Sequence, residues 1–265
     1  MMSDGFVTVT KGHRLCAKKK KKGKEKGGHA KEGCIESISE TGRGDILYKR
    51  ILQRKEELKA NNFIKALNFK ELSEVKNVIC YGTGSIEEST TAQYQVAAIL
   101  LLIETFLHKV EDILIYDPIL QENELVVLEK LGLINIGFNE HCRHIAHAQT
   151  LFYMPHCGLA LYNNLLYANW SPEKLSNCCI IGNSFSDYYL KLTDAELTSK
   201  GYYLREIKGL FKELPFNASL CSSDDVFNDT SLHLFHISNL KDLPITVWTK
   251  NPEPSLDPDD EEMTL

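Results

Sequence analysis

The stretch Val78-Ile-Cys-Tyr-Gly-Thr-Gly-Ser85 decides the fold of this 265-residue chain. Its first four residues predict a short buried strand, and the Gly-Thr-Gly that follows predicts a tight turn. The apolar residues of 87–109 then predict a packing helix that is buried on almost every side around Val96–Ile103. A buried strand, a glycine turn and a long helix together indicate the first half of a βαβ unit.

Strand and helix patterns continue to alternate beyond this unit. Further strands are predicted at 112–116, 133–136, 150–154, 178–181 and 245–248. Helices are predicted at 45–68, 122–131, 140–148, 159–170 and from Ser171 onward. Such alternation is typical of parallel sheets with right-handed crossovers. The predicted fold class is α/β, a Rossmann-like doubly wound, mostly parallel sheet with helices on both faces.

The composition is that of a globular protein, with 43% hydrophobic and 25% charged residues and a net charge of −6. Residues 1–31 carry ten Lys and Arg against two acidic residues, whereas 250–265 carry one Lys and six acidic residues. The segment between these ends is also acidic, which argues against a nucleic-acid interface on the folded part. We expect a disordered basic arm at 1–44, one domain at 45–249 and a disordered acidic tail at 250–265.

Nothing in the sequence predicts a membrane or secretory protein. The longest apolar run, Val96–Ile103, falls far short of the roughly 20 residues of a membrane span, and no signal-peptide pattern opens the chain. None of the eight cysteines forms a Cys-x-x-Cys pair, so we expect reduced, buried thiols. These features predict a cytoplasmic protein without a membrane partner. The block Lys18–Lys26 predicts either a nuclear import signal or polyanion tether, or a solvated tail.

Candidate ligand-binding residues follow the first two strands, because ligands of open parallel sheets bind beyond the carboxyl ends of the strands. Gly82 and Gly84 would let the backbone approach a phosphate or a ribose, with Ser85 leading into the helix. The third glycine of the dinucleotide fingerprint is absent, since Glu87 occupies its position. Asp117 is either an acceptor for a ribose diol or a turn residue. A small-molecule pocket and a tight structural turn both fit this pattern.

Further candidates follow the later strands. His156 and Cys157 come after the fourth strand, where a base or nucleophile is often placed, and Asn183 comes after the fifth. Adjacent side chains diverge from an extended backbone, so His156 and Cys157 make a poor dyad, and helix capping is the alternative for His156. The histidines of 140–147 lack a carboxylate or distant histidine of matching spacing, so a solvated helix face is favoured over a metal site. The residues assign no catalytic role, metal or cofactor.

Four segments resemble the SRR-like family, named for sensitivity to red light reduced: YGTGS (81–85), ILIYDP (113–118), LFYMPHCGLALYNNLLYANWSPEKLSN (151–177) and IIGNSF (180–185). The resemblance spans about Asn77 to Tyr189. It implies a regulatory function, with circadian clock input in plants and animals, regulation of haem biosynthesis in animals and microtubule-related processes in fungi. The candidate residues match the family motifs, but no established chemistry of the family assigns them a role.

Two functions follow as expectations. The first is a regulatory protein that acts through protein partners, with the pocket binding a small nucleotide-like effector or none. The alternative is an uncharacterised enzyme that uses a nucleotide-type cofactor, as a methyltransferase does. Direct haem or metal binding is a third, weaker hypothesis. The ligand-binding hypotheses require Gly84, Asp117, His156 and Asn183 to surround one cleft.

Overall fold

The computed structural model describes residues 40–63, 67, 69–216 and 226–256, and the following description refers to these residues. The predicted import block Lys18–Lys26 lies outside them, as do most of the predicted basic arm and the acidic end of the tail. The first helix, α1 (Glu40–Ala60), begins inside the segment predicted as an arm.

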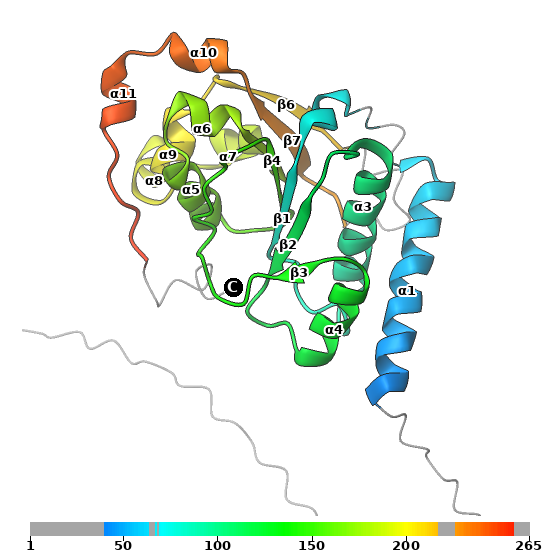
Figure 1. The fold of residues 1–265 in the computed structure, drawn as a ribbon. Helices are drawn as coiled ribbons and strands as arrows, with labels where there is room; N and C mark the ends of the chain where they lie inside the picture. Colours follow the sequence, from blue (N-terminus) through cyan, green and yellow to red (C-terminus); the bar gives the residue numbers. More distant parts are fainter. Residues whose placement is uncertain (1–39, 64–66, 68, 217–225, 257–265) are drawn as a thin grey trace, which may run out of the picture. The chain divides into compact units, whose positions relative to one another are not determined.

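A seven-stranded, mostly parallel sheet forms the centre of the fold (Figure 1). Its strands are β1 (Asn77–Tyr81), β2 (Asp112–Tyr116), β3 (Ile134–Asn135), β4 (Thr150–Met154), β5 (Cys178–Asn183), β6 (Phe211–Pro215) and β7 (Thr230–Phe235). They lie in the order β3-β2-β1-β4-β5-β7-β6. Strands β1 to β5 are parallel, whereas β7 runs antiparallel to both β5 and β6. The carboxyl ends of β1, β2, β4 and β5 therefore share one edge of the sheet.

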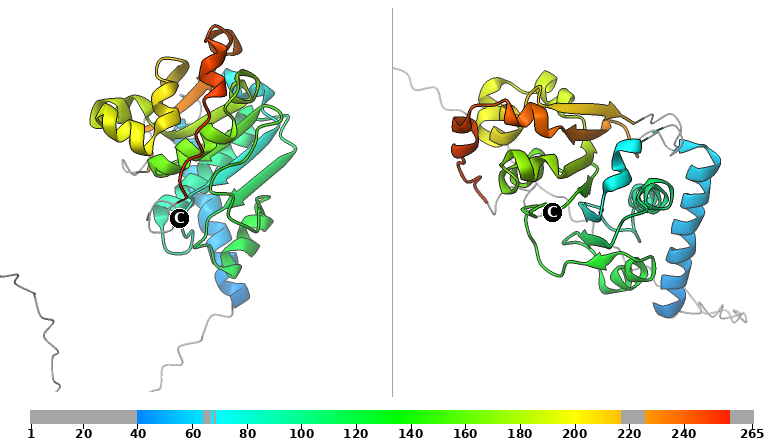
Figure 2. Two further views of the ribbon diagram at one scale, coloured as in Figure 1. Left: turned by 90° about the vertical axis from the view of Figure 1, so that its left-hand side faces the viewer. Right: turned by 45° about the horizontal axis from the view of Figure 1, so that its top comes forward.

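Helices lie on both faces of this sheet (Figures 1 and 2). One face carries α1, α3 (Thr90–Phe106) and α4 (Glu122–Lys130). The remaining elements are η1 (Lys70–Glu74), α5 (Leu159–Ala168), α6 (Pro172–Ser176), α7 (Phe185–Lys191), α8 (Asp194–Lys200), α9 (Tyr202–Glu206), α10 (Ile237–Lys241) and α11 (Ile245–Thr249). Helix α5 packs on the other face, with α8 and α9 against it.

The central strands divide their side chains between two hydrophobic clusters. In β1, Val78 and Cys80 join the cluster under α1 and α3, whereas Ile79 and Tyr81 join the cluster under α5. Strands β4 and β5 alternate in the same way. A two-residue period places successive side chains on opposite faces, so a strand that is apolar throughout must be covered on both sides. This explains the unbroken apolar runs of the sequence.

The helix that begins after Ser171 has the N-terminal cap that the sequence predicts. Ser171 is the N-cap of α6, its hydroxyl accepts a hydrogen bond from the Lys174 amide, and Pro172 occupies the first helical position. The long packing helix is confirmed as α3, whose N-cap Ser89 accepts a bond from the Ala92 amide. Strand β4 has the predicted bounds, 150–154.

Two predicted elements are wrong. Residues 245–248, predicted as the last strand, form α11 after Pro244, because four apolar residues carry too little periodicity to separate strand from helix. Residues 140–148, predicted as a helix, form a turn at 141–142 followed by irregular backbone, because His141 and Cys142 have left-handed φ values of +48° and +58°. Strands β6 and β7 were not predicted at all.

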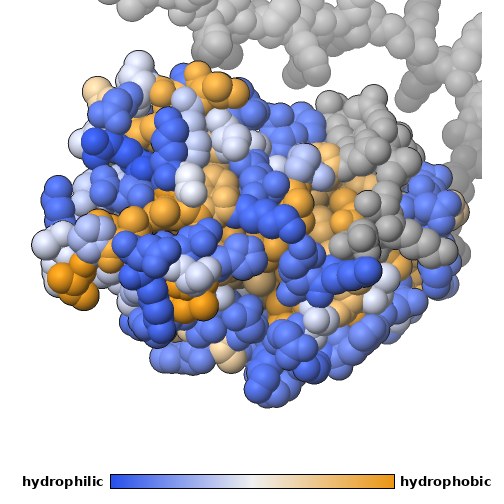
Figure 3. All heavy atoms as spheres, turned by 90° about the horizontal axis from the view of Figure 1, so that it is seen from above, coloured by the Kyte–Doolittle hydropathy of each residue, from blue (hydrophilic) through white to orange (hydrophobic). Residues whose placement is uncertain are grey.

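The hydrophobic surface of the described part is divided into small areas. Figure 3 shows, on the end of the sheet where the parallel strands begin, hydrophobic residues separated by hydrophilic ones. In the described part of the chain, no helix combines the length and apolar character that crossing a membrane requires. Scattered exposed apolar residues are ordinary on proteins and do not by themselves mark an interface.

Candidate functional site

The loop after β1 requires both of its glycines. Gly82 and Gly84 have φ values of +66° and +73°, a region that side chains with a Cβ rarely adopt. A Cβ on Gly82 would also lie 2.5 Å from the Cys157 sulfur, whereas one on Gly84 would meet no atom within 4 Å. The chain therefore makes a close turn at Gly82, packed against Cys157 in the loop after β4.

Asp117 closes onto this loop from the end of β2. One carboxylate oxygen accepts a 2.7 Å hydrogen bond from the Gly84 amide, and the other accepts a 3.0 Å bond from the Ile119 amide. The residue is 7% exposed. A carboxylate offers about four lone-pair positions, so the two bonds leave acceptor capacity for a ligand hydroxyl.

Glu124, at the start of α4, is a structural residue of this site that the sequence analysis missed. It is fully buried, and one oxygen accepts hydrogen bonds from the Ser85 hydroxyl at 2.8 Å and the Glu87 amide at 2.9 Å. Its other oxygen accepts a bond from the Gln121 amide. A Glu three residues after a helix N-cap is the capping-box signal that could have identified it. Ser85 is therefore engaged with a protein carboxylate.

His156 follows β4 with its side chain exposed and a left-handed φ of +61°. Its amide donates a 2.8 Å hydrogen bond to the Asn183 side-chain oxygen. Its ring Nε2 lies 2.9 Å from the Val226 carbonyl oxygen, which can only accept, so Nε2 carries the proton. In the neutral ring Nδ1 is then an acceptor.

Cys157 is buried between the loops after β1 and β4. Its thiol donates a 3.5 Å hydrogen bond to the Tyr81 carbonyl oxygen. Burial raises the pKa of this thiol well above its usual range, and the nearby Asp117 charge raises it further. A thiol that stays protonated is a poor nucleophile, so the geometry favours a packing role.

Asn183 ties the end of β5 to the loop after β4. Its side-chain amide donates bonds to the Cys157 carbonyl at 2.9 Å and to the Tyr188 hydroxyl at 3.0 Å. The Asn183 backbone amide bonds the hydroxyl of the fully buried Tyr162, which donates in turn to the Met154 carbonyl. Asn183 therefore joins two strand ends.

The histidine-rich segment 140–147 contacts the site through the carboxylate of Glu140. Its sequence had raised the question of a metal site formed by the histidines. The Tyr81 hydroxyl donates to the Glu140 carboxylate, and the His144 ring nitrogen lies 3.1 Å from the same carboxylate. Burial raises the pKa of Tyr81 well above its usual range, and its hydrogen bond to Glu140 adds to the shift. Among the described residues, no group of three or more metal-ligating side chains is placed to hold an ion.

All seven predicted site residues lie at the carboxyl edge of the sheet, and they are called the carboxyl-edge cluster below. The β1–β2 group is Gly82, Gly84, Ser85 and Asp117, and the β4–β5 group is His156, Cys157 and Asn183. Two larger grooves of the described part, of about 540 and 830 Å³, are lined by other residues. Hydrogen bonds join Gly84 to Asp117 in the first group, and join His156 and Cys157 to Asn183 in the second. None of the seven residues lines either groove.

The chain is similar to known proteins over a region that includes these residues. The SRR1 domain model matches residues 49–234, about 70% of the chain. The chain is 44% identical to an SRR1-like protein of Mus musculus over 40% of this chain and 43% of that protein. It is 34% identical to the Arabidopsis thaliana Protein SENSITIVITY TO RED LIGHT REDUCED 1 over 64% of this chain and 62% of that protein.

An SRR1-like protein of Drosophila melanogaster is 29% identical over 61% of this chain and 55% of that protein. The matched regions thus span between 43% and 62% of the lengths of these curated relatives. No solved structure matches the chain. The domain match covers well over half of the sequence and contains β1 to β5 with all seven clustered residues, and on this evidence the chain belongs to the SRR1 family.

Proposed function

We propose that this chain is a regulatory protein whose carboxyl-edge cluster binds a small nucleotide-type ligand, and which acts through protein partners. The family supports the regulatory part, since one relative is named for its role in sensitivity to red light. The proposal extends to circadian clock input and, through the resemblance to animal members, to regulation of haem biosynthesis.

The observation that carries the ligand-binding part is the bond between Asp117 and the Gly84 amide. It brings a glycine turn and a strand-end carboxylate together near the boundary between the neighbouring strands β1 and β4, where the strand order reverses direction. Ligands of Rossmann-like sheets bind at such a reversal, and an acid at the end of the second strand accepts bonds from a ribose. His156 adds an exposed ring with an acceptor nitrogen at the same edge.

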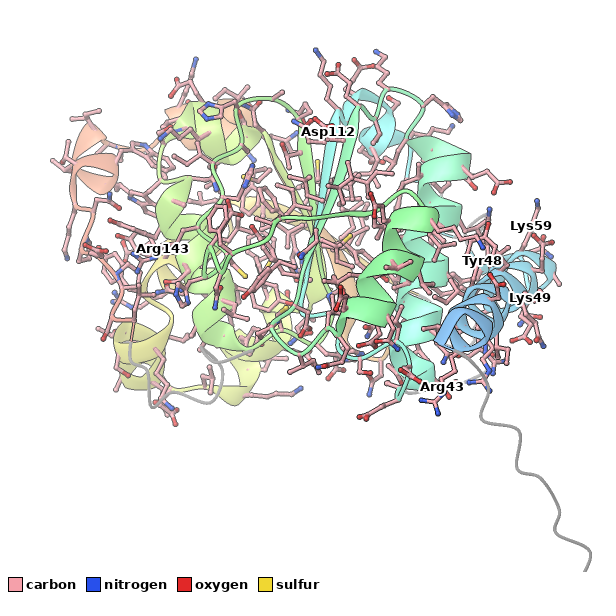
Figure 4. All side chains as sticks on the ribbon, turned by 60° about the horizontal axis from the view of Figure 1, so that its bottom comes forward. Arg43, Tyr48, Lys49, Lys59, Asp112 and Arg143 are labelled. Carbon is pink, nitrogen blue, oxygen red and sulfur yellow. The ribbon has the colours of Figure 1, made fainter. Side chains whose placement is uncertain are left out.

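Thermal-shift and calorimetric titration test this proposal with S-adenosylmethionine, NAD, ATP and haemin as probes. We expect one nucleotide-type probe to raise Tm of the wild-type chain, and the effect to be lost in Asp117→Asn and weakened in His156→Ala. Asp112→Asn is the matched control, because this residue is exposed at the opposite end of the same strand, as Figure 4 shows. Equal binding by the control and both variants, or no binding of any probe, would contradict the proposal.

An enzyme that transfers a methyl group is the second candidate, and the strand order supports it. A reversed strand β7 between β5 and the parallel β6 is the arrangement of Rossmann-like methyltransferases, although fold analogy alone assigns no reaction. Conversion of S-adenosylmethionine to S-adenosylhomocysteine in the presence of cell extract, lost in Asp117→Asn, would favour this candidate. Binding without conversion would favour the regulatory function.

The cellular location remains a proposal carried by the sequence. A lysine block of this density can serve as an import signal. We expect a fluorescent fusion of the full chain to enter the nucleus, and replacement of the lysines of 18–26 by alanine to confine it to the cytoplasm. The same distribution for both fusions would leave the block without an import function.

A further inference from the structure

The C-terminal segment of the described chain packs beside a groove on the α5 side of the sheet. The groove is about 540 Å³ and is lined by side chains of α5, α8 and α9 on one side. Its other wall is the extended segment Pro252–Ser255. This segment falls in the part of the chain predicted as a disordered tail, so contacts with the domain must order it.

Arg143 contacts both a charged side chain and a backbone carbonyl of the segment. One guanidinium nitrogen lies 2.7 Å from a Glu253 carboxylate oxygen, and another donates a 2.8 Å bond to the Pro254 carbonyl. The guanidinium stacks over the Tyr167 ring, 5.1 Å from its centre, which fixes its plane (Figure 4 labels Arg143 beside α5). The Arg143 Nε is buried and has no hydrogen-bond partner among the described residues. A planar fork held in this way is suited to an acidic, extended peptide.

Aromatic residues supply the rest of the surface. The Tyr203 hydroxyl lies within hydrogen-bond distance of the Asn251 side chain and the Pro252 carbonyl. Trp170 packs on the Tyr203 ring, with ring centres 4.7 Å apart, and on Trp248 at 5.1 Å. Aromatic grooves that bind peptide carbonyls through hydroxyl or indole groups are typical of the recognition of proline-containing extended segments.

We propose that the surface formed by Arg143, Tyr167 and Tyr203 is a recognition site for acidic Pro-x-Pro segments of protein partners, and that the chain's own residues 251–255 occupy this surface in cis. This proposal goes beyond the proposed ligand site, because the surface consists of different residues. The segment follows α11 directly, so its effective concentration at the surface is on the order of millimolar. The Arg143–Glu253 pair holds it weakly, because the Glu253 side chain is 66% exposed. A partner segment of the same chemistry can therefore exchange with it.

The test uses the full chain and a fluorescein-labelled peptide of residues 249–256, followed by fluorescence anisotropy. Glu253→Lys in the chain weakens the binding of the cis segment and leaves Arg143, Tyr167 and Tyr203 in place. We expect this variant to bind the peptide at least about ten-fold more tightly than the wild type, because its cis competitor is weakened. Adding Arg143→Ala should abolish that binding, whereas adding Arg50→Ala, an exposed arginine on α1, should not.

A charge exchange and the wild-type chain provide independent measurements. A peptide with lysine in place of Glu253 should bind Arg143→Glu and not the chain with Arg143. In the wild type, millimolar peptide should change the tryptophan emission, since Trp170 packs on Tyr203, which contacts the segment, and on Trp248, which shortly precedes it. Failure of the peptide to bind either chain, or binding that is insensitive to Arg143, would overturn the proposal. Neither outcome depends on nucleotide binding at Asp117.

Discussion

At Gly82, the backbone conformation and the neighbouring thiol both exclude a side chain. The φ of +66° costs an alanine about 1–2 kcal/mol, and a Cβ 2.5 Å from the Cys157 sulfur adds an overpacking cost. Gly82→Ala should therefore lower the free energy of unfolding by about 2–5 kcal/mol in urea titrations.

Gly84→Ala is the matched control for this substitution, because its φ is similar and its added Cβ would meet nothing within 4 Å. It should lose only the conformational part, about 1–2 kcal/mol. Adding Cys157→Ala to Gly82→Ala should recover part of the loss. Equal losses for the two glycine variants would show that the sulfur contact does not matter.

The lowered pKa of the Glu213 carboxyl predicts that the stability of the chain depends on pH. Burial would raise the pKa of its carboxyl, but hydrogen bonds from His233, Ser184 and Ser186 outweigh burial and hold the pKa well below its usual range. Because the folded-state pKa is depressed, this stabilisation is complete above the unfolded value of about 4.3 and is lost as pH falls toward the folded value. Free energies of unfolding from pH 7 to pH 3 should therefore fall less steeply in Glu213→Gln than in the wild type.

The exposed Glu56 provides the control for this experiment, and Glu56→Gln should leave the pH dependence unchanged. A wild-type slope in Glu213→Gln would assign the acid sensitivity to other groups.

Helix α1 is held on the domain mainly by its apolar face. Ile51 and Leu58 are fully buried against the core, and the Tyr94 hydroxyl of α3 donates a 2.6 Å bond to Glu57. Leu58→Ala should lower the free energy of unfolding by about 2–5 kcal/mol. Ile46→Ala, on the same helix but 41% exposed, should change it by less than about 1 kcal/mol. Similar effects of the two would mean that α1 is not docked as described.

Elements with a strong local signal were predictable, and those that depend on distant contacts were not. Strand β4 and the helix after Ser171 carry their own boundaries, a proline stop and a capped start. The five residues of β6, Phe-Lys-Glu-Leu-Pro, are a mixed pattern, and they become a strand by pairing with β7. The left-handed residues His141 and Cys142 break a segment whose composition favours a helix.

The candidate site shows the same division. The position of the seven residues at one edge was predictable, because a parallel sheet must bring its strand ends together there. Their bonds were not, because each partner lies far along the chain: 33 residues separate Gly84 from Asp117, and 39 separate Ser85 from Glu124. Asp117 thus bonds another residue of the cluster, whereas Ser85 bonds Glu124, which was not predicted.

Across the whole molecule, protection from solvent should follow the order of the sheet. Strands β1, β4 and β5 are buried on both faces, whereas both residues of the edge strand β3 are exposed. Hydrogen exchange should therefore be slowest in the first three and near that of an open chain in β3 and α11. Exchange in β4 as fast as in β3 would contradict the described core.

The position of β7 constrains how the chain can fold as it is made. Strand β5 ends at Asn183, but the strand that covers its outer edge begins only at Thr230. A growing chain therefore carries five parallel strands with an unpaired edge while the intervening residues are synthesised, and such edges template association. A nascent chain halted before Thr230 should bind chaperones and aggregate when released, and one halted after α10 should not.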